Sequence, residues 1–279
     1  MTPTSCRWRH ALAGLALLLP SAVSSAQVAA TDTSRAQQTL FTARDALLAA
    51  GFAGVTVAMF PIDKHFQTHL RDQSTPANRF LDRSATGFEY VTTPGSFLIG
   101  GSLYVLGAAT GHRGVQDLGW HGTEAVLVGS AITGLLKGVL GRARPDFVAD
   151  TRPSDFKFAK GFSSSSRQSF PSGHTTTAFA AAAAVTSEVN RMWPKYTWYV
   201  APVLYGGATL VGVSRMYHNR HWASDVALGA GIGTFSGLKV VKYSHAHPDN
   251  FIDRVILRTG VVPDGRGGAY LVWSAPAPR

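Results

Sequence analysis

Apolar residues in this chain gather into long segments, which are separated by shorter stretches rich in charged residues, glycine and proline. The segments are longer than β-strands usually are, and their length is typical of helices. The pattern therefore predicts an all-α fold, whose six main helical segments centre on residues 40–62, 95–111, 122–143, 173–190, 196–214 and 222–242.

The stretches between these segments differ in character. Residues 63–92 are charged and have little apolar periodicity, so we expect them to cap one end of the helices. Residues 146–170 contain Gly161 and a serine run at 163–166, which predicts a mobile loop over the neighbouring helix ends. Near the C-terminus, Val255–Val262 and Ala269–Trp273 flank a Pro-Asp-Gly turn signal, so a small β-hairpin is predicted there.

The N-terminus has the pattern of a signal peptide. Arg7 and Arg9 precede a short apolar stretch, Ala11–Leu19, and Ser24-Ser25-Ala26 offers a small-residue cleavage site. Cys6, the single cysteine, would leave with this peptide, and the mature chain would have no disulfide. The predicted organisation is a signal peptide at 1–26, a helical domain at 27–245 and a C-terminal extension at 246–279.

Whether the helices span a membrane is left open by the pattern. A spanning helix needs about twenty apolar residues, and only the uncharged runs Tyr90–His112 and Tyr196–Ser214 approach that length, each with a proline. A cleaved signal peptide followed by six spanning helices would also turn the end of the third helix towards the cytoplasm. These arguments favour an exported, soluble bundle in the periplasm, with an integral membrane protein as the alternative.

The charge balance indicates an anionic partner. Lysine and arginine number 26 against 16 acidic residues, for a net charge of +10 in 279 residues, but no lysine or arginine run points to nucleic acid. The positive charge is then explained by an anionic substrate or by an anionic membrane surface. Several cations in the region 137–167 could attract such a substrate or simply be solvated: Arg142, Arg152, Lys157, Lys160 and Arg167.

Three short blocks carry the candidate chemistry, and the first supplies fixed positive charge. Lys137 and Arg144 lie seven residues apart, which places both on one face of a helix. Pro145 should end that helix at Arg144. With Arg215 from the third block, these residues could stabilise the outer oxygens of a phosphoryl group during transfer.

The second block, Pro171-Ser172-Gly173-His174, is typical of a helix start. Ser172 is a favourable N-cap, and Gly173 lets the backbone approach a ligand closely. The free N–H groups of the first turn would then face an anion, with His174 beside it as a general acid for the leaving oxygen.

The third block, from Ser214-Arg215 to His221 and Asp225, supplies a nucleophile. His221 and Asp225 are four residues apart, so on a helix Asp225 could accept a hydrogen bond from Nδ1 of His221. That bond would fix the tautomer and leave Nε2 free to attack phosphorus. Each block alone is ordinary, but together they assemble one site.

The three blocks resemble the signature of the type 2 phosphatidic acid phosphatase (PAP2) superfamily, which also contains bacterial class A acid phosphatases and vanadium haloperoxidases. The likeness covers roughly residues 90–245. It implies a six-helix PAP2-like bundle and metal-free hydrolysis of phosphomonoesters through a phosphohistidine on His221. It also implies a phosphate-binding role for the remaining site residues, Lys137, Arg144, Ser172, Gly173 and Arg215.

The resemblance leaves the substrate open between lipid phosphates, such as phosphatidate or prenyl pyrophosphate, and small soluble esters. A vanadium-dependent haloperoxidase and a non-enzymatic phosphate-binding protein are the alternatives. No cofactor or metal is predicted, because His112, His121 and His218 have no ligand spacing with carboxylates or cysteines. His218 could contact substrate, whereas His112 and His121 are expected at helix ends without a role.

Overall fold

The computed structural model describes residues 39–70, 79–92, 94–148, 150–248, 250–257, 259–263 and 269–273. The predicted signal peptide, its cleavage site and Cys6 lie outside the described residues. The division into a signal peptide, a domain and an extension therefore stays a prediction.

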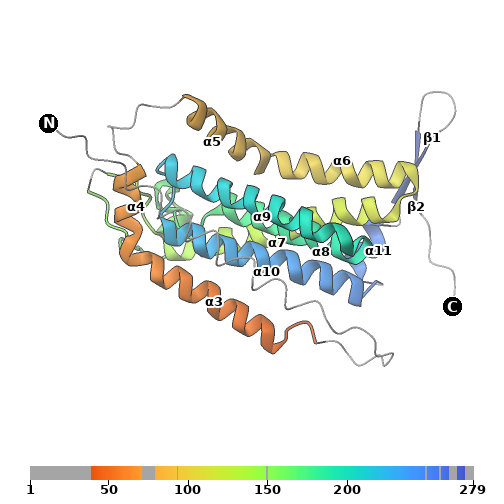
Figure 1. Cartoon of the computed structure of the whole chain (residues 1–279), viewed down its shortest axis with the longest axis horizontal. Coiled ribbons are helices and arrows are strands. Elements are labelled where there is room, and N and C mark those ends of the chain that lie inside the picture. Colours follow the sequence, from red (N-terminus) through yellow and green to blue (C-terminus); the bar gives the residue numbers. More distant parts are fainter. Residues whose placement is uncertain are drawn as a thin grey trace. The chain divides into compact units, whose positions relative to one another are not determined.

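The all-α prediction is confirmed, because a long helix overlaps each of the six predicted segments (Figure 1). These helices are α3 (Ala43–Met59), α6 (Gly95–Thr110), α7 (Arg113–Leu140), α8 (Gly173–Met192), α9 (Pro194–Tyr217) and α10 (Ala223–Ala246).

Residues 63–92, which were expected to form a cap without helical periodicity, instead contain two helices. The 3-10 turn η2 (Phe60–Ile62) leads directly from α3 into α4 (Asp63–Leu70), and α5 (Arg79–Thr92) packs against α9. Buried positions on α5 include Ala85 and Thr92, with Glu89 half-buried between them. Apolar residues do recur at helical spacing along this helix, at Leu81, Ala85 and Phe88, so the predicted lack of periodicity was wrong for α5.

The C-terminal region combines a short helix with the predicted hairpin. Helix α11 (Phe251–Ile256) precedes strand β1 (Thr259–Pro263), which pairs antiparallel with β2 (Ala269–Trp273). The register runs from Thr259 opposite Trp273 to Pro263 opposite Ala269. The first strand begins later than the predicted Val255 because α11 occupies the preceding residues.

The core is formed by α7, α8 and α10, which pack together through small side chains. Ala125 and Val126 of α7 contact Ala180 and Ala184 of α8 in a buried cluster that also includes Val240 and Val241 of α10. At Gly237 of α10, an added β-carbon would lie 2.6 Å from the carbonyl oxygen of Ala180. Glycine there allows the two helix backbones to approach closely, which holds their N-terminal ends together at the site.

Several helices turn large apolar side chains outward. Within the described residues, two helical stretches, Ala43–Leu70 and Arg113–Leu140, are long and apolar enough to cross a membrane. Only 6% and 28% of their apolar windows are buried, so most of these side chains lie outside the core, although one face of α7 packs within it. Apolar residues are also exposed on α6 and α9, among them Leu98 and Val203. This surface favours a membrane location over the soluble bundle that the sequence favoured.

The segment between α7 and α8 is folded against the end of α7. Two short 3-10 turns, η3 (Lys160–Phe162) and η4 (Ser165–Arg167), interrupt it. Backbone hydrogen bonds join Ala143 N to Asp155 O at 2.9 Å and Lys157 N to Gly141 O at 3.1 Å. The structure therefore differs from the mobile loop that was predicted, because these bonds attach the segment to the chain that leaves α7.

Candidate active site

Helix α7 ends earlier than the proline in the sequence suggested. Gly141 adopts a left-handed conformation, with φ of 55°, and stops the helix at Leu140. Arg144 is therefore not on one helical face with Lys137, as was expected, but lies in the extended segment that follows. Lys137 remains in the last helical turn, where its Nζ donates a hydrogen bond to the carbonyl oxygen of Gln168 at 2.5 Å.

Helix α8 begins at the predicted block, with an uncapped first turn. Ser172 occupies the N-cap position, but its side chain makes no capping hydrogen bond; its Oγ accepts one from the Thr175 hydroxyl at 2.9 Å. The first N–H groups of α8 thus keep their capacity to bind an anion. An added β-carbon on Gly173 would lie 3.6 Å from Cε of Lys137, so the lysine lies directly beside this helix start.

Two arginines complete the positive charge around this helix start. The Nε atoms of Arg144 and Arg215 are buried and have no hydrogen-bond partner in the part of the chain that the structure describes. Lys137, Arg144 and Arg215 are all close enough to His174 for their charges to act on it. Buried donors without partners are costly, and an anion such as phosphate would satisfy them.

His221 is held with its Nδ1 atom facing two acceptors. Nδ1 lies 2.7 Å from the carbonyl oxygen of Ser169 and 3.4 Å from Oδ2 of Asp225. Because neither group can donate, Nδ1 must carry the proton, and Nε2 of the neutral ring has a free lone pair. Burial, followed by the charge of nearby Lys137, lowers the pKa of His221 to about 3, so the ring stays neutral.

The sequence predicted the contact with Asp225, but not the shorter one with Ser169. No sequence pattern indicates a main-chain acceptor 52 residues away, so this partner could be found only from the structure.

Asp225 is fixed by a buried network that the sequence did not reveal. It accepts hydrogen bonds from Ser169 Oγ at 2.5 Å and from the backbone N–H of Trp222 at 2.8 Å. Its other oxygen pairs with Arg142. Burial alone would raise the pKa of Asp225, but Arg142 and His221 hold it below its usual value. The carboxylate therefore stays charged beside His221.

Arg142, a candidate for attracting substrate, is fully buried beneath the site. Its guanidinium also pairs with Asp63 at 2.7 Å and lies over several aromatic rings, Phe60 and Trp222 among them. Asp63 in turn accepts a hydrogen bond from the backbone N–H of Ser224 at 2.8 Å, at the start of α10. Arg142 thus fixes the loop that carries His221 and does not face solvent.

Arg167, another of those cations, is similarly engaged. It is buried and pairs with Asp155 through both guanidinium nitrogens, at 3.0 and 3.1 Å. This ion pair joins two parts of the segment between α7 and α8. The position of Arg167 therefore does not support a role in attracting substrate.

Glu89 of α5 also contacts the site, and the sequence did not predict its involvement. Its Oε1 pairs with Arg215 and lies 2.5 Å from Nδ1 of His218. The carboxylate therefore orients one of the three cations. His218, which the sequence left open between a substrate contact and a solvated loop residue, belongs to this ion-pair group. Only the spatial packing of α5 on α9 brings Glu89 there, so no motif could have indicated it.

His174 lies in the first turn of α8, half-buried among the cations. Burial, followed by the charge of Arg215, lowers the pKa of His174 to about 4. In the ligand-free protein it is therefore neutral at pH 7. A bound phosphate dianion would offset the nearby positive charge and favour its protonated form.

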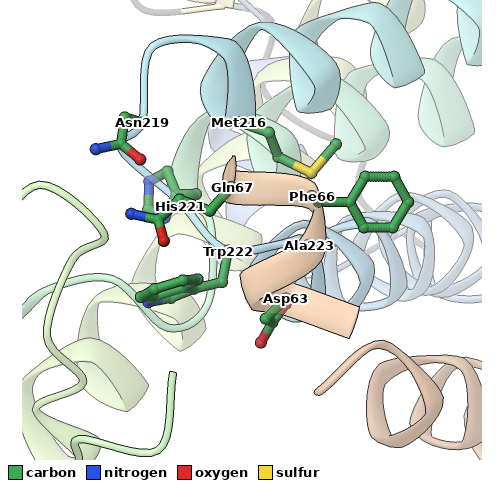
Figure 2. A pocket seen from close by; sticks show the side chains of 8 residues that line it. All are labelled: Asp63, Phe66, Gln67, Met216, Asn219, His221, Trp222 and Ala223. Atoms are coloured by element: carbon green, nitrogen blue, oxygen red, sulfur yellow. The ribbon is translucent and has the colours of Figure 1, made fainter. Parts of the chain in front are cut away.

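The turn that carries His221 is supported from the side by α4. Figure 2 shows a small hollow beside His221, lined by Asn219 and Trp222 of the turn and by Phe66 and Gln67 of α4. Gln67 also donates a hydrogen bond to the carbonyl oxygen of Pro145, 3.3 Å away. Helix α4 therefore links the His221 turn to the segment that follows Arg144.

A comparison with known families decides the identity of this arrangement. Residues 119–248 match the PAP2 superfamily, and this range contains every predicted site residue from Lys137 to Asp225. This part of the chain belongs to the PAP2 superfamily. The resemblance of the three blocks is thereby confirmed, and the roles of individual residues remain to be proposed.

Three similar proteins add detail to this PAP2 assignment. The chain is 46% identical over 69 residues to a lipid A 1-phosphatase of Porphyromonas gingivalis, covering 25% of this chain and 15% of that protein. It is 34% identical over 116 residues to a lipid A 1-phosphatase of Rhizobium johnstonii, covering 40% and 42%. The crystal structure of a transmembrane PAP2 type phosphatidylglycerolphosphate phosphatase from Bacillus subtilis superposes with a TM-score of 0.55 at 21% identity, covering 72% of this chain and 96% of that one.

The two comparisons differ in what they support. The chain spans less than half of the length of each of these lipid A phosphatases. The two matches therefore show similarity to a part of each protein. The Bacillus structure, which is only distantly similar in sequence, shows the shared fold.

Proposed function

We propose that this PAP2 protein is a phosphatase that hydrolyses phosphate monoesters of membrane lipids through a phosphohistidine on His221. The observation that carries the proposal is the orientation of His221. Its protonated Nδ1 is held by Ser169 and Asp225, and its pKa is lowered, so Nε2 is a ready nucleophile near three cations.

In the proposed first step, Nε2 of His221 attacks phosphorus and the bond from phosphorus to the ester oxygen breaks. His174, protonated in the substrate complex, donates its proton to the leaving oxygen. Lys137, Arg144 and Arg215, with the Ser172 hydroxyl and the N–H of Gly173, would stabilise the negative oxygens of the transferring group. The released alcohol carries the donated proton.

In the second step, neutral His174 removes a proton from a water molecule, and the oxygen of that water attacks the phosphohistidine. The bond between phosphorus and Nε2 breaks, inorganic phosphate leaves, and His221 regains its lone pair. Protons and charges balance over the cycle, and neither step requires a metal ion.

Two observations favour a lipid substrate. Relatives that match part of the chain are lipid A 1-phosphatases, and the apolar outer faces of α3 and α7 fit a membrane that would contain such a lipid. We therefore propose that the chain is embedded in a membrane and acts on a lipid-linked phosphate, with the 1-phosphate of lipid A as the first candidate. Export by an N-terminal signal peptide stays part of this proposal.

A substrate panel tests this function. The full chain, purified in detergent, would be assayed for phosphate release from lipid A, phosphatidate, prenyl pyrophosphate and glucose 1-phosphate. We expect kcat/KM for at least one lipid to exceed that for glucose 1-phosphate by at least about tenfold, because contacts remote from the phosphate contribute to catalysis. His221→Gln is the control and should release none. Equal rates on the soluble ester would contradict the lipid proposal, and activity in the control would contradict the mechanism.

A further inference from the structure

A second buried cluster of polar side chains lies at the opposite end of the core helices. It joins His121 of α7, Glu188 of α8 and His245 of α10, whose ligand atoms all lie within 4.8 Å of one another. Oε1 of Glu188 is 2.5 Å from Nδ1 of His121 and 2.8 Å from Nε2 of His245. The sequence predicted no role and no ligand spacing for His121, because its partners are 67 and 124 residues away in the chain and only the packing brings them together.

This cluster is enclosed and is not an exposed surface pair. His121 and Glu188 are each 1% exposed, and the side chain of His245 is 20% exposed. Oε2 of Glu124 is buried and has no hydrogen-bond partner among the described residues, and Nε2 of His121 has only an ion-pair contact with Asp253 at 3.7 Å. Buried polar atoms without partners are uncommon and often indicate an ion or a ligand.

The cluster has four carboxylates in or near it, against the two histidines and Arg113, whose charge acts on Asp117. Asp117, Glu124 and Asp253 lie near enough to His121 for their charges to interact with it, in addition to Glu188. Carboxylates gathered in a bundle interior need a positive counter-charge, since burial penalises unpaired charge. A divalent cation would provide that charge at the centre of the cluster.

We propose that His121, Glu188 and His245 bind a divalent transition metal ion, for which Zn²⁺ fits the donor set best. Two imidazole nitrogens and one carboxylate oxygen are accepted by Zn²⁺ at roughly 2.0–2.2 Å, with a fourth position left for water. Ligand atoms around such an ion stand roughly 3.3 Å apart. Glu188 would retreat from its present 2.5 and 2.8 Å, and the two imidazole nitrogens, which now lie within 4.8 Å of each other, would move together to reach that spacing. Zn²⁺ takes the place of the proton on Nδ1 of His121 and on Nε2 of His245, while Glu188 stays a carboxylate.

Asp253 of α11 is placed to orient the His121 ring towards this ion. With Nδ1 bound to the metal, Nε2 of His121 must carry the proton, and Oδ2 of Asp253 lies 3.7 Å from it. Asp253 is itself held by Trp120, whose Nε1 donates to Oδ1 at 2.9 Å. Metal binding would therefore join α7, α8 and α10 and also attach α11 to them.

The ion would be structural with respect to the proposed phosphatase chemistry. His121 and Lys137 are sixteen residues apart on α7, which corresponds to about 24 Å along the helix. The inference therefore stands whether or not the proposed function is correct, and its test uses metal uptake and thermal stability instead of activity.

The test uses the full chain without an affinity tag, stripped with a chelator in detergent and titrated with Co²⁺, whose visible absorption reports tetrahedral nitrogen and oxygen ligands. We expect one equivalent to bind, Zn²⁺ to displace it, and Zn²⁺ to raise the melting temperature. His245→Ala and Glu188→Gln should abolish the Co²⁺ spectrum. Asp253→Asn should weaken binding by roughly 10–100-fold.

His247→Ala is the matched control, because His247 is exposed at the same helix end and should not affect uptake. A wild-type protein that shows no Co²⁺ spectrum would overturn the proposal directly, even if the variants fail to fold. Equal uptake by wild type and His245→Ala would also overturn it.

Discussion

At the residue scale, the site depends on how Nδ1 of His221 is held. The sequence assigned this task to Asp225, and the structure adds the Ser169 carbonyl at a shorter distance. Asp225 also forms a buried ion pair with Arg142. Its carboxylate therefore both holds the His221 turn in place and supplies negative charge beside the His221 ring.

Asp225→Asn should lower kcat by about 10²–10⁴-fold, because the amide no longer stabilises positive charge on His221. It should also lower the melting temperature, since removing one partner of a buried ion pair costs about 3–5 kcal/mol. Ser169→Ala is the control: it removes the hydroxyl but keeps the carbonyl that contacts Nδ1, so kcat should fall less than about tenfold. Comparable losses of kcat in the two variants would contradict the role of Asp225.

The pH dependence should reflect the lowered pKa values of both histidines. Because the pKa of His221 is about 3, its neutral form is present above that pH, and kcat/KM should not rise between pH 5 and 7 as it would for a histidine titrating near 6.5. Because the pKa of His174 is about 4 in the free protein, its acid form is lost as pH rises, and kcat/KM should decline towards alkaline pH.

Rate profiles from pH 4 to 9 on an alkyl and an aryl phosphate would measure this dependence. The decline should be shallower for the aryl ester, whose leaving group needs less protonation. An acidic limb near pH 6.5 on both substrates would contradict the account.

At the scale of elements, α5 contributes more than the motifs suggested. Its Glu89 pairs with Arg215 and contacts His218, so a helix outside the signature blocks orients a predicted phosphate ligand. We expect Glu89→Gln to lower kcat by about 10–100-fold, because Arg215 loses its fixed position, while KM stays equal or falls with the loss of a nearby negative charge.

Asp146→Asn provides the comparison for this prediction. Asp146 pairs with Arg220 at 2.9 Å, and the Arg220 side chain is half exposed, so the pair should matter little. An unchanged kcat in Glu89→Gln, or equal effects of the two variants, would show that α5 does not position the site.

The elements also show what can be predicted from this sequence. Long apolar segments indicated all six main helices, because their length and composition suit no other element. The end of α7 was misplaced because Gly141, with its positive φ, stops the helix before Pro145 can. Helices α4 and α5 were missed because charged residues dominate residues 63–92, although apolar residues recur at helical spacing in α5. Their inward faces also carry polar partners, Asp63 for Arg142 and Glu89 for Arg215. The spacing of the motifs was enough to predict which residues form the site. The contacts of Asp63 and Glu89 that support those residues depend on packing between distant segments, which the sequence does not reveal.

At the scale of the whole molecule, the outward apolar faces determine how the protein should be handled. The stretches Ala43–Leu70 and Arg113–Leu140 leave most of their apolar windows unburied, which a soluble protein would rarely tolerate. We expect the untagged chain to sediment with membranes, resist carbonate extraction and be released by detergent. Recovery in the soluble fraction, without detergent and with activity, would contradict the membrane proposal and restore the soluble bundle.

The central claim is a covalent phosphate on His221, and trapping it is the most direct test. The enzyme would be mixed with a phosphate-labelled lipid substrate and quenched in alkaline detergent, where a phosphorus–nitrogen bond survives. Trypsin should then release residues 221–239, because cleavage follows Arg220 and Lys239, and His221 is the one histidine in that peptide. The account predicts the label on this peptide in wild type and none in His221→Gln. Turnover without label on this peptide, or label on another histidine, would contradict it.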